Sequence, residues 1–137
     1  MRVFFLIWAG LCLPGTTYSQ SNSQPVLDTY LSVFKTNTAD DLPLADDVTF
    51  LGALLPEPIV GRDQVIVFLN RVAPSVQLTQ VKQAFESPSG ACAELVFALQ
   101  DGDLIMEEAH CIRIRDGEIV SIRLYFDPRP LLEASGT

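Results

Sequence analysis

The stretch ACAELVFALQDGDLIMEEAHCIRIRDGEIVSIRLYFD, residues Ala91–Asp127, decides the fold. It consists of three alternating apolar runs separated by Asp101-Gly102 and Asp116-Gly117. Asp-Gly between such runs is a strong local signal for a β-hairpin, because both residues tolerate the positive φ of a tight turn. The stretch therefore predicts two consecutive hairpins that share a middle strand. That strand carries His110, the only histidine in the sequence.

The first turn sets the register of the first hairpin. A two-residue loop at Asp101-Gly102 predicts five directly opposed pairs, which are Leu99 with Leu104, Phe97 with Met106, Leu95 with Glu108, Ala93 with His110, and Cys92 with Cys111. Side chains alternate between the two faces of a strand. Glu108 and His110 are therefore expected on one face with apolar neighbours, and the two cysteines on the opposite face.

The second turn allows two registers. A two-residue loop would place Ser121, Arg123 and Tyr125 on the face of His110, whereas a three-residue loop, Arg115-Asp116-Gly117, places Val120, Ile122, Leu124 and Phe126 there. A slip of one residue exchanges the whole apolar set. We therefore predict the three-residue loop, with Gly117 at the positive φ of a bulged turn and His110 opposite Ile122.

The residues before the hairpins predict two helices and two strands. A helix from about Pro25 to Asn37 carries an apolar stripe that includes Tyr30, and a second helix opens at Gly61-Arg62-Asp63, with Asp63 or its predecessor as cap, and ends at Pro74. Leu42–Ala45 is expected as a turn or poor helix, Val48–Leu51 as a short strand, Val76–Phe85 as a long strand, and the segment after Asp127 as a tail with two prolines.

This order of elements predicts an α+β fold. Helices that precede the strands must pack on one face of the antiparallel sheet that the strands form. A strongly curved sheet closed by helices encloses a cone-shaped space, which is a typical ligand pocket.

The N-terminus has the three regions of a signal peptide. Met1-Arg2 is positively charged, Val3–Leu13 is apolar, and Thr17-Tyr18-Ser19 offers small residues for cleavage. The apolar run is too short to span a bilayer. We expect residues 1–19 to be removed and residues 20–137 to form one secreted or periplasmic domain, without a membrane segment in the mature form. The alternative is a buried N-terminal strand.

Composition excludes several classes of function. Nine basic and seventeen acidic residues give a net charge of −8, without a basic patch, so nucleic acid is not an expected partner. Removal of residues 1–19, which include Cys12, leaves two cysteines and one histidine without the spacing of a zinc site. No phosphate-binding glycine loop is present, so we expect no metal and no cofactor. Cys92 and Cys111 form either a disulfide, which export permits, or two free thiols on a sheet face.

Three segments resemble the nuclear transport factor 2-like superfamily, and within it the SnoaL-like and ketosteroid isomerase-like proteins. They are LADDVTF (Leu44–Phe50), PEPIVGRDQV (Pro56–Val65) and DGEIVSIRLYFDP (Asp116–Pro128). In ketosteroid isomerases a tyrosine and a protonated aspartate donate hydrogen bonds to an oxyanion, and a second aspartate is the base. The resemblance places Tyr30 at the tyrosine, His110 at the donor aspartate and Gly52 at the base, so the base is missing. It also implies a homodimer through the outer face of the sheet.

Tyr30, His110 and Glu108 are the candidate catalytic residues. His110 can donate a hydrogen bond to an oxyanion or move a proton, and an apolar setting suits Glu108 to acid–base work. The alternative is structural, with His110 and Tyr30 as hydrogen-bonded core residues and Glu108 at a wet rim. Residues expected to line or floor the cone are Phe34, Phe50, Phe68, Phe97, Met106, Ile122, Leu124 and Phe126.

Two classes of function follow. The first is an enzyme that binds a small apolar molecule with a carbonyl group and catalyses an isomerisation, cyclisation or dehydration without a cofactor. The second is a ligand-binding or dimeric scaffold module without catalysis. A cavity in which Tyr30, Glu108 and His110 converge within hydrogen-bond reach would favour the enzyme, and a filled cone would favour the scaffold.

Overall fold

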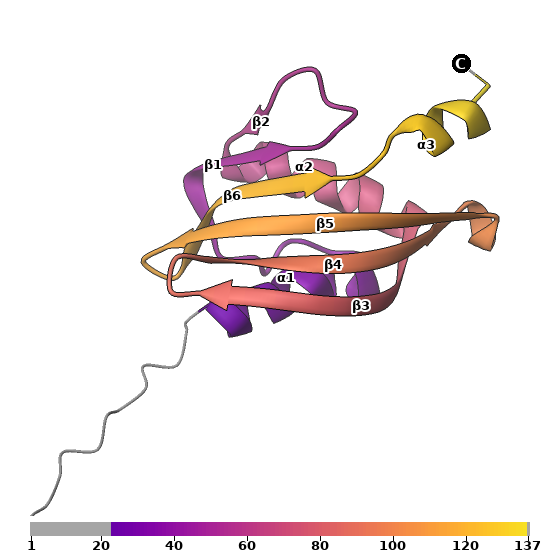
Figure 1. Ribbon diagram of the computed structural model, residues 1–137. Helices are drawn as coiled ribbons and strands as arrows, with labels where there is room; N and C mark the ends of the chain where they lie inside the picture. The colour runs from indigo at the N-terminus through magenta and orange to yellow at the C-terminus, as the bar shows by residue number, and fades with distance from the viewer. Residues whose placement is uncertain (1–22, 137) are drawn as a thin grey trace, which may run out of the picture.

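The computed structural model describes residues 23–136, so the expected signal peptide lies outside the described residues. The helices in this part are α1 (Ser23–Thr36), α2 (Arg62–Val72) and α3 (Arg129–Ala134). The strands are β1 (Leu44–Leu51), β2 (Ile59–Val60), β3 (Val76–Ser87), β4 (Gly90–Leu99), β5 (Leu104–Arg115) and β6 (Glu118–Tyr125). They form one sheet in the order β2-β1-β6-β5-β4-β3, and Figure 1 shows α1 and α2 on the same face of it.

Helices α1 and α2 cover the sheet with the apolar stripes expected from the sequence. Leu27, Tyr30 and Leu31 are buried on α1, and Val65 and Leu69 are buried on α2. The expected cap of α2 was wrong, because Gly61 is the N-cap and makes no side-chain hydrogen bond, while Asp63 lies in the first turn. Gly61 has a φ of 101°, a conformation that favours glycine, and this explains why glycine occupies the N-cap position of α2.

The register of the first hairpin is confirmed. Cys92 lies opposite Cys111, Ala93 opposite His110, and Leu95 opposite Glu108. In the second hairpin the predicted loop was wrong. Asp116 and Gly117, with φ of 53° and 77°, form a two-residue turn, and the register shifts afterwards between Ile119 and Ser121.

This register shift takes the place of the expected three-residue loop, because it also moves the apolar residues of β6 after Val120 to the inner face. It keeps Ile122 and Leu124 on the inner face, but His110 lies opposite Leu124 instead of Ile122. Val120 is the extra residue at the shift, and it lies instead beside Ser121 and Arg123 on the outer face. A bulge re-aims side chains without a longer loop, so the apolar pattern predicted the face correctly and the turn incorrectly.

Strand β1 differs from the prediction in length and direction. It starts at Leu44, where a turn or poor helix was expected, and it pairs with β6 in parallel, so the sheet is mixed and not purely antiparallel. Arg62 contacts both strands, because its Nε donates to the Leu44 carbonyl and its guanidinium pairs with Asp46 and Glu118. These contacts join the start of α2 to β1 and β6. Tertiary pairing of this kind overrides the low strand propensity of two aspartates.

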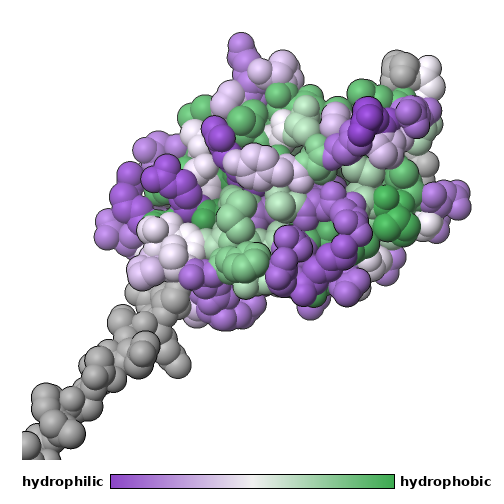
Figure 2. All heavy atoms as spheres, in the orientation of Figure 1, coloured by the Kyte–Doolittle hydropathy of each residue, from purple (hydrophilic) through white to green (hydrophobic). Residues whose placement is uncertain are grey.

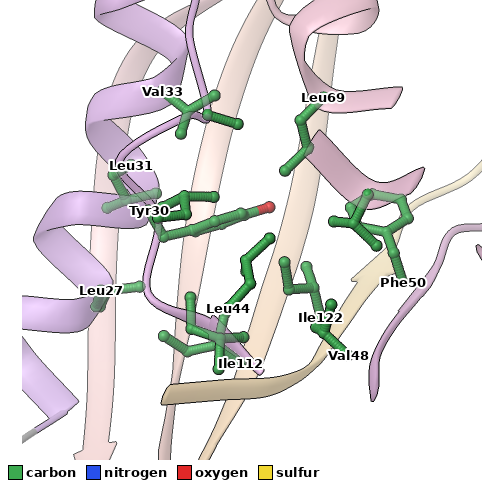
Figure 3. Packing of buried hydrophobic residues seen from close by; sticks show 14 of the residues in the cluster. Leu27, Tyr30, Leu31, Val33, Leu44, Val48, Phe50, Leu69, Ile112 and Ile122 are labelled. Atoms are coloured by element: carbon green, nitrogen blue, oxygen red, sulfur yellow. The ribbon is translucent and has the colours of Figure 1, made fainter. Parts of the chain in front are cut away.

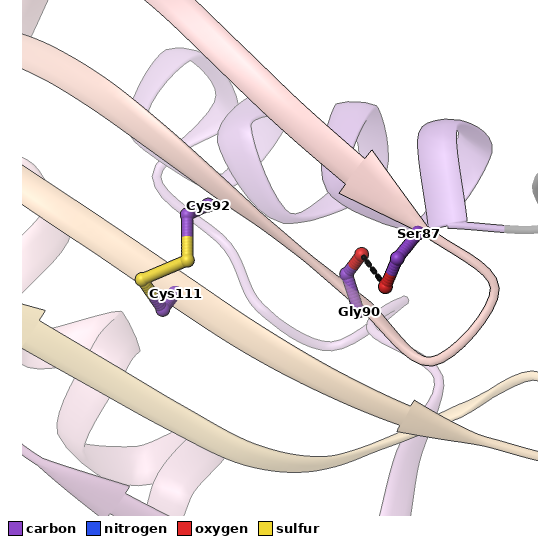
Figure 4. Close-up of a disulfide and its surroundings, with 4 residues drawn as sticks. All are labelled: Ser87, Gly90, Cys92 and Cys111. Carbon is purple, nitrogen blue, oxygen red and sulfur yellow. Dashed lines mark hydrogen bonds between the residues drawn. A yellow bond between two sulfur atoms is a disulfide. The ribbon is translucent and has the colours of Figure 1, made fainter.

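The outer face of the sheet carries the disulfide between Cys92 and Cys111 (Figure 4). Nearby, the Ser87 hydroxyl donates to the carbonyl of Gly90 at 3.2 Å. A Cβ at Gly90 would lie only 2.3 Å from the backbone oxygen of Ile112, so the close approach of β4 and β5 requires glycine there. Figure 2 views the outer face, which mixes hydrophilic side chains with hydrophobic ones, and Phe85, Ile105 and Tyr125 are exposed.

Candidate functional site

A cavity of about 310 Å³ lies between the inner face of the sheet and the helices. Its wall is mainly apolar, and the polar side chains in it come from Tyr30, Ser75, Glu108 and His110. The other lining residues are Phe34, Phe50, Gly52, Leu54, Leu55, Phe68, Leu69, Val72, Val76, Phe97, Leu99, Leu124, Phe126 and Leu131. The expected cone is therefore hollow.

Tyr30, His110 and Glu108 form a continuous chain of hydrogen bonds, which we call the polar triad. The Tyr30 hydroxyl lies 2.9 Å from His110 Nδ1, and His110 Nε2 lies 2.8 Å from Glu108 Oε2. The exposed fraction is 0% for Tyr30, 1% for His110 and 10% for the Glu108 side chain. This burial does not match the alternative in which Glu108 lies at a wet rim. The structure brings together the three residues that the sequence indicated as catalytic candidates.

Local structure explains the positions of these side chains. Glu108 and His110 are two residues apart on β5, so they point to the same face and bond to each other. Tyr30 lies within the apolar stripe of α1, and Figure 3 shows its hydroxyl pointing away from the helix, towards the side of the core where Leu69 and Phe50 lie. Its hydroxyl reaches His110 across the helix–sheet interface, which satisfies both buried polar groups.

The protonation states of Glu108 and His110 determine the direction of the two hydrogen bonds. A carboxylate only accepts, so with Glu108 ionised the proton of neutral His110 lies on Nε2 and is donated to Oε2. Nδ1 is then an acceptor, and it receives the proton of the Tyr30 hydroxyl. Both available protons are used inside the polar triad. In this state the triad offers a ligand acceptors only, namely the Tyr30 oxygen and the second carboxylate oxygen.

Adding one proton reverses this pattern. When His110 carries protons on both nitrogens, Nδ1 donates to the Tyr30 oxygen and the Tyr30 hydroxyl proton becomes available to a ligand. Tyrosinate does not provide an alternative, because burial, followed by the negative charge of Glu108, raises the pKa of Tyr30 far above its ordinary value. Uptake of a single proton by His110 would therefore convert the triad from an acceptor into a donor.

Aromatic rings surround the triad. Phe97 stacks on His110 with ring centroids 5.3 Å apart, and Phe34 contacts both the His110 and Tyr30 rings edge-on. Phe50 and Phe68 form a second pair, with centroids 5.0 Å apart. The contacts of Phe97 and Phe34 with His110 hold the imidazole in one orientation, which a proton relay needs.

The structure places most, but not all, of the expected lining residues at the cavity. Phe34, Phe50, Phe68, Phe97, Leu124 and Phe126 line it. Met106 and Ile122 do not, since both are buried within the packed structure on the inner face of the sheet. Because of the register shift in β6, Ile122 lies opposite Ile112, which is two residues further along β5 than His110.

Sequence reasoning missed the contribution of the loop after β1 and of the C-terminal tail. Leu54 and Leu55 from that loop, and Leu131 from α3, line the cavity. Apolar residues beside prolines in segments expected to be irregular were the available signal.

Arg129 at the start of α3 hydrogen-bonds to Asp127 and lowers the pKa of this carboxyl to about 2. This contact fixes the turn that leads from β6 into α3.

Other kinds of site receive no support in the described part of the chain. Residues 23–136 contain no cluster of three His, Cys, Asp or Glu side chains that could hold a metal ion. Within the same range, every helix is too short or too polar to cross a bilayer.

Comparison with known proteins found no matching family description and no matching curated protein sequence. Solved structures do match. A steroid Δ-isomerase from Pseudomonas aeruginosa superposes with a TM-score of 0.71 and 21% identity, over 85% of this chain and 88% of that chain. An NTF2-like protein of unknown function from Mesorhizobium loti gives a TM-score of 0.69 and 17% identity, over 77% and 91%.

A third structure is a hypothetical protein from Catenulispora acidiphila with a ketosteroid isomerase-like fold, solved in complex with trimethylamine. Its TM-score is 0.68 and its identity 19%, over 83% of this chain and 94% of that chain. At such low identity, these similarities establish the fold and leave the activity open. This chain therefore has the curved α+β fold of the nuclear transport factor 2-like and ketosteroid isomerase-like proteins.

Proposed function

We propose that this protein is an exported domain that binds a small apolar molecule with one carbonyl group and moves a proton on it without a cofactor. The observation that carries the proposal is the polar triad in a cavity of about 310 Å³ whose wall is otherwise almost entirely apolar. The apolar wall would hold the body of the ligand, and the triad would hold its polar end.

The proposed reaction uses the two ends of the triad. A ligand carbonyl oxygen would accept a hydrogen bond from Tyr30 once His110 has taken up a proton. The free oxygen of Glu108 would then remove a proton from the carbon next to the carbonyl, and an enolate oxygen would develop at Tyr30. Return of that proton to a different carbon completes an isomerisation. Return of the proton from Glu108 to a β-hydroxyl, which then leaves as water while the enolate regains its carbonyl, completes a dehydration instead.

Glu108 takes the role of base in this proposal because Gly52 occupies the position where the resemblance implies an aspartate. Glu108 reaches the cavity from β5 and its carboxylate is held by the His110 Nε2 proton. Gly52 also lines the cavity, so the missing aspartate would have pointed into the same space.

The test is exchange of the α-hydrogens of a ligand ketone with solvent deuterium, followed by NMR. The ligand is first identified by native mass spectrometry of the mature protein from its own host. Glu108→Gln should abolish exchange while binding persists, and Glu94→Gln, the same charge change on an exposed residue of β4, should leave the exchange rate unchanged. Exchange that survives in Glu108→Gln would refute the assignment of the base.

The second candidate is a ligand-binding or dimeric scaffold module without catalysis. Gly52 at the position of the base favours it, as does the outer sheet face, where Phe85, Ile105 and Tyr125 are exposed. Binding of the ketone without any exchange in the wild type would select this function. Sedimentation of the purified domain would test the dimer, which we expect to form through that face.

A further inference from the structure

We infer that the same cavity is a binding site for hydrophobic ammonium ions, and that it prefers such a cation to a neutral molecule of the same shape. The inference rests on the proposed use of the cavity as a ligand site, but not on the proposed catalysis. Charge, hydrogen-bond direction and aromatic content each support it.

In residues 23–136, the lining of the cavity has one carboxylate and no permanent positive charge, so its net charge is negative when Glu108 is ionised and His110 is neutral. Among the described residues that line it, Glu108 is acidic, and none is lysine or arginine. The groups facing Glu108 are His110 on its own strand and Tyr30 on α1, and they are the other titratable side chains of the lining. With His110 neutral, the carboxylate charge is solvated by one hydrogen bond from Nε2. A buried charge gains from a counter-ion when water is scarce.

The hydrogen-bond direction also favours a cation or another donor. The two protons of the resting triad are committed to His110 Nδ1 and Glu108 Oε2. Glu108 lines the cavity, and among residues 23–136 the hydrogen bond to its carboxylate is the one between Oε2 and His110 Nε2. A protonated amine can donate to the other carboxylate oxygen, and a quaternary ammonium ion can contact it by charge alone. A carbonyl ligand has no partner here until the triad takes up a proton.

The aromatic content supplies the third argument. The rings of Phe34, Phe50, Phe68, Phe97 and Phe126 line the cavity. The negative face of an aromatic ring attracts cations, and this attraction is stronger in a desolvated site. The ring of Phe68 on α2 already contacts one cation, because the guanidinium of Arg71 lies 5.7 Å from its centroid. Arg71 itself does not line the cavity.

The experiment compares choline with 3,3-dimethylbutan-1-ol, which has the same shape with carbon in place of the charged nitrogen. Dissociation constants are measured by NMR titration at neutral pH and low salt, first with the wild-type protein. We expect choline to bind at least about tenfold more tightly than the alcohol. Equal affinities, or binding of the alcohol alone, would overturn the inference.

Glu108→Gln then tests the source of the preference. It should weaken choline binding about tenfold and change the affinity for the alcohol less than about threefold. The matched control, Glu94→Gln on the outer face, should leave both affinities within about twofold. A choline preference that survives Glu108→Gln would also overturn the inference.

The same titrations separate this inference from the proposed function. If neither probe binds while a ketone binds and exchanges, the ammonium site is refuted and the proposed enzyme stands. If choline binds through Glu108 and the ketone neither binds nor exchanges, the ammonium site stands and the proposed enzyme is refuted.

Discussion

Removing the Tyr30 hydroxyl should destabilise the protein by about 2 kcal/mol. The Tyr30→Phe variant keeps the ring and removes the proton donated to His110 Nδ1 over 2.9 Å. Tyr30 and His110 are 0% and 1% exposed, so Nδ1 is left as a buried acceptor without a partner. Such an orphaned group costs about 1–3 kcal/mol. The cavity beside it can admit water, which argues against the upper end of this range.

Urea denaturation of the oxidised protein measures this cost, with the slope m unchanged because the surface exposed on unfolding is unchanged. For a domain of this size the expected loss corresponds to a fall in Tm of about 8 °C. Tyr125→Phe is the control, because Tyr125 is 53% exposed on the outer face, and it should cost less than about 0.5 kcal/mol. A cost of Tyr30→Phe no larger than that of Tyr125→Phe would refute the hydrogen-bonded triad.

The remaining predictions concern pH, the disulfide, the turn at β4 and the missing base. Because the pKa of Tyr30 is raised by burial and then by Glu108, the folded state keeps a proton that the unfolded chain releases. Stability should therefore fall as the pH rises above about 10, less steeply in Tyr30→Phe, as measured by urea denaturation across pH 9–11. The disulfide between Cys92 and Cys111, which are 19 residues apart, restricts the unfolded chain by closing a loop. Replacing both cysteines with serine should therefore lower the free energy of unfolding by about 3 kcal/mol at most. An unchanged free energy of unfolding would contradict this argument. Gly90→Ala should destabilise by more than about 1 kcal/mol, because its Cβ would meet the Ile112 oxygen at 2.3 Å. The Gly52→Asp variant should fold, because the nearest atom to the new Cβ is Leu124 Cβ at 3.8 Å. It should accelerate the exchange of the ketone α-hydrogens. An unchanged exchange rate would show that Gly52 does not occupy the position of a base.

The alternating pattern of Ala91–Asp127 predicted the inner face of the sheet, because burial of one face determines the register. The same pattern placed Glu108 and His110 side by side on that face. The pattern could not reveal how the second hairpin reaches that register. A three-residue loop and a two-residue turn followed by a bulge both leave Leu124 on the inner face, and only the backbone of Asp116 and Gly117 distinguishes them.

The parallel pairing of β1 with β6 was also beyond local reasoning. It joins two strands, Leu44–Leu51 and Glu118–Tyr125, that are far apart in the sequence, and no local pattern indicates such a pairing. The same limitation applies to the cavity wall. Leu54, Leu55 and Leu131 come from segments with prolines and no clear periodicity, so nothing local showed that they face the ligand space.

The most direct test of the polar triad is the nitrogen NMR spectrum of His110. The chain contains one histidine, so incorporating histidine that carries ¹⁵N only in its imidazole ring into an untagged protein yields signals from these two ring nitrogens alone. With Glu108 ionised and His110 neutral, the two hydrogen bonds predict a proton on Nε2 and an unprotonated, hydrogen-bonded Nδ1 in the resting protein. A bound ketone should convert both nitrogens to the protonated form, and bound choline should leave the resting pattern in place. A proton on Nδ1 in the resting protein, or signals that no ligand alters, would contradict the account.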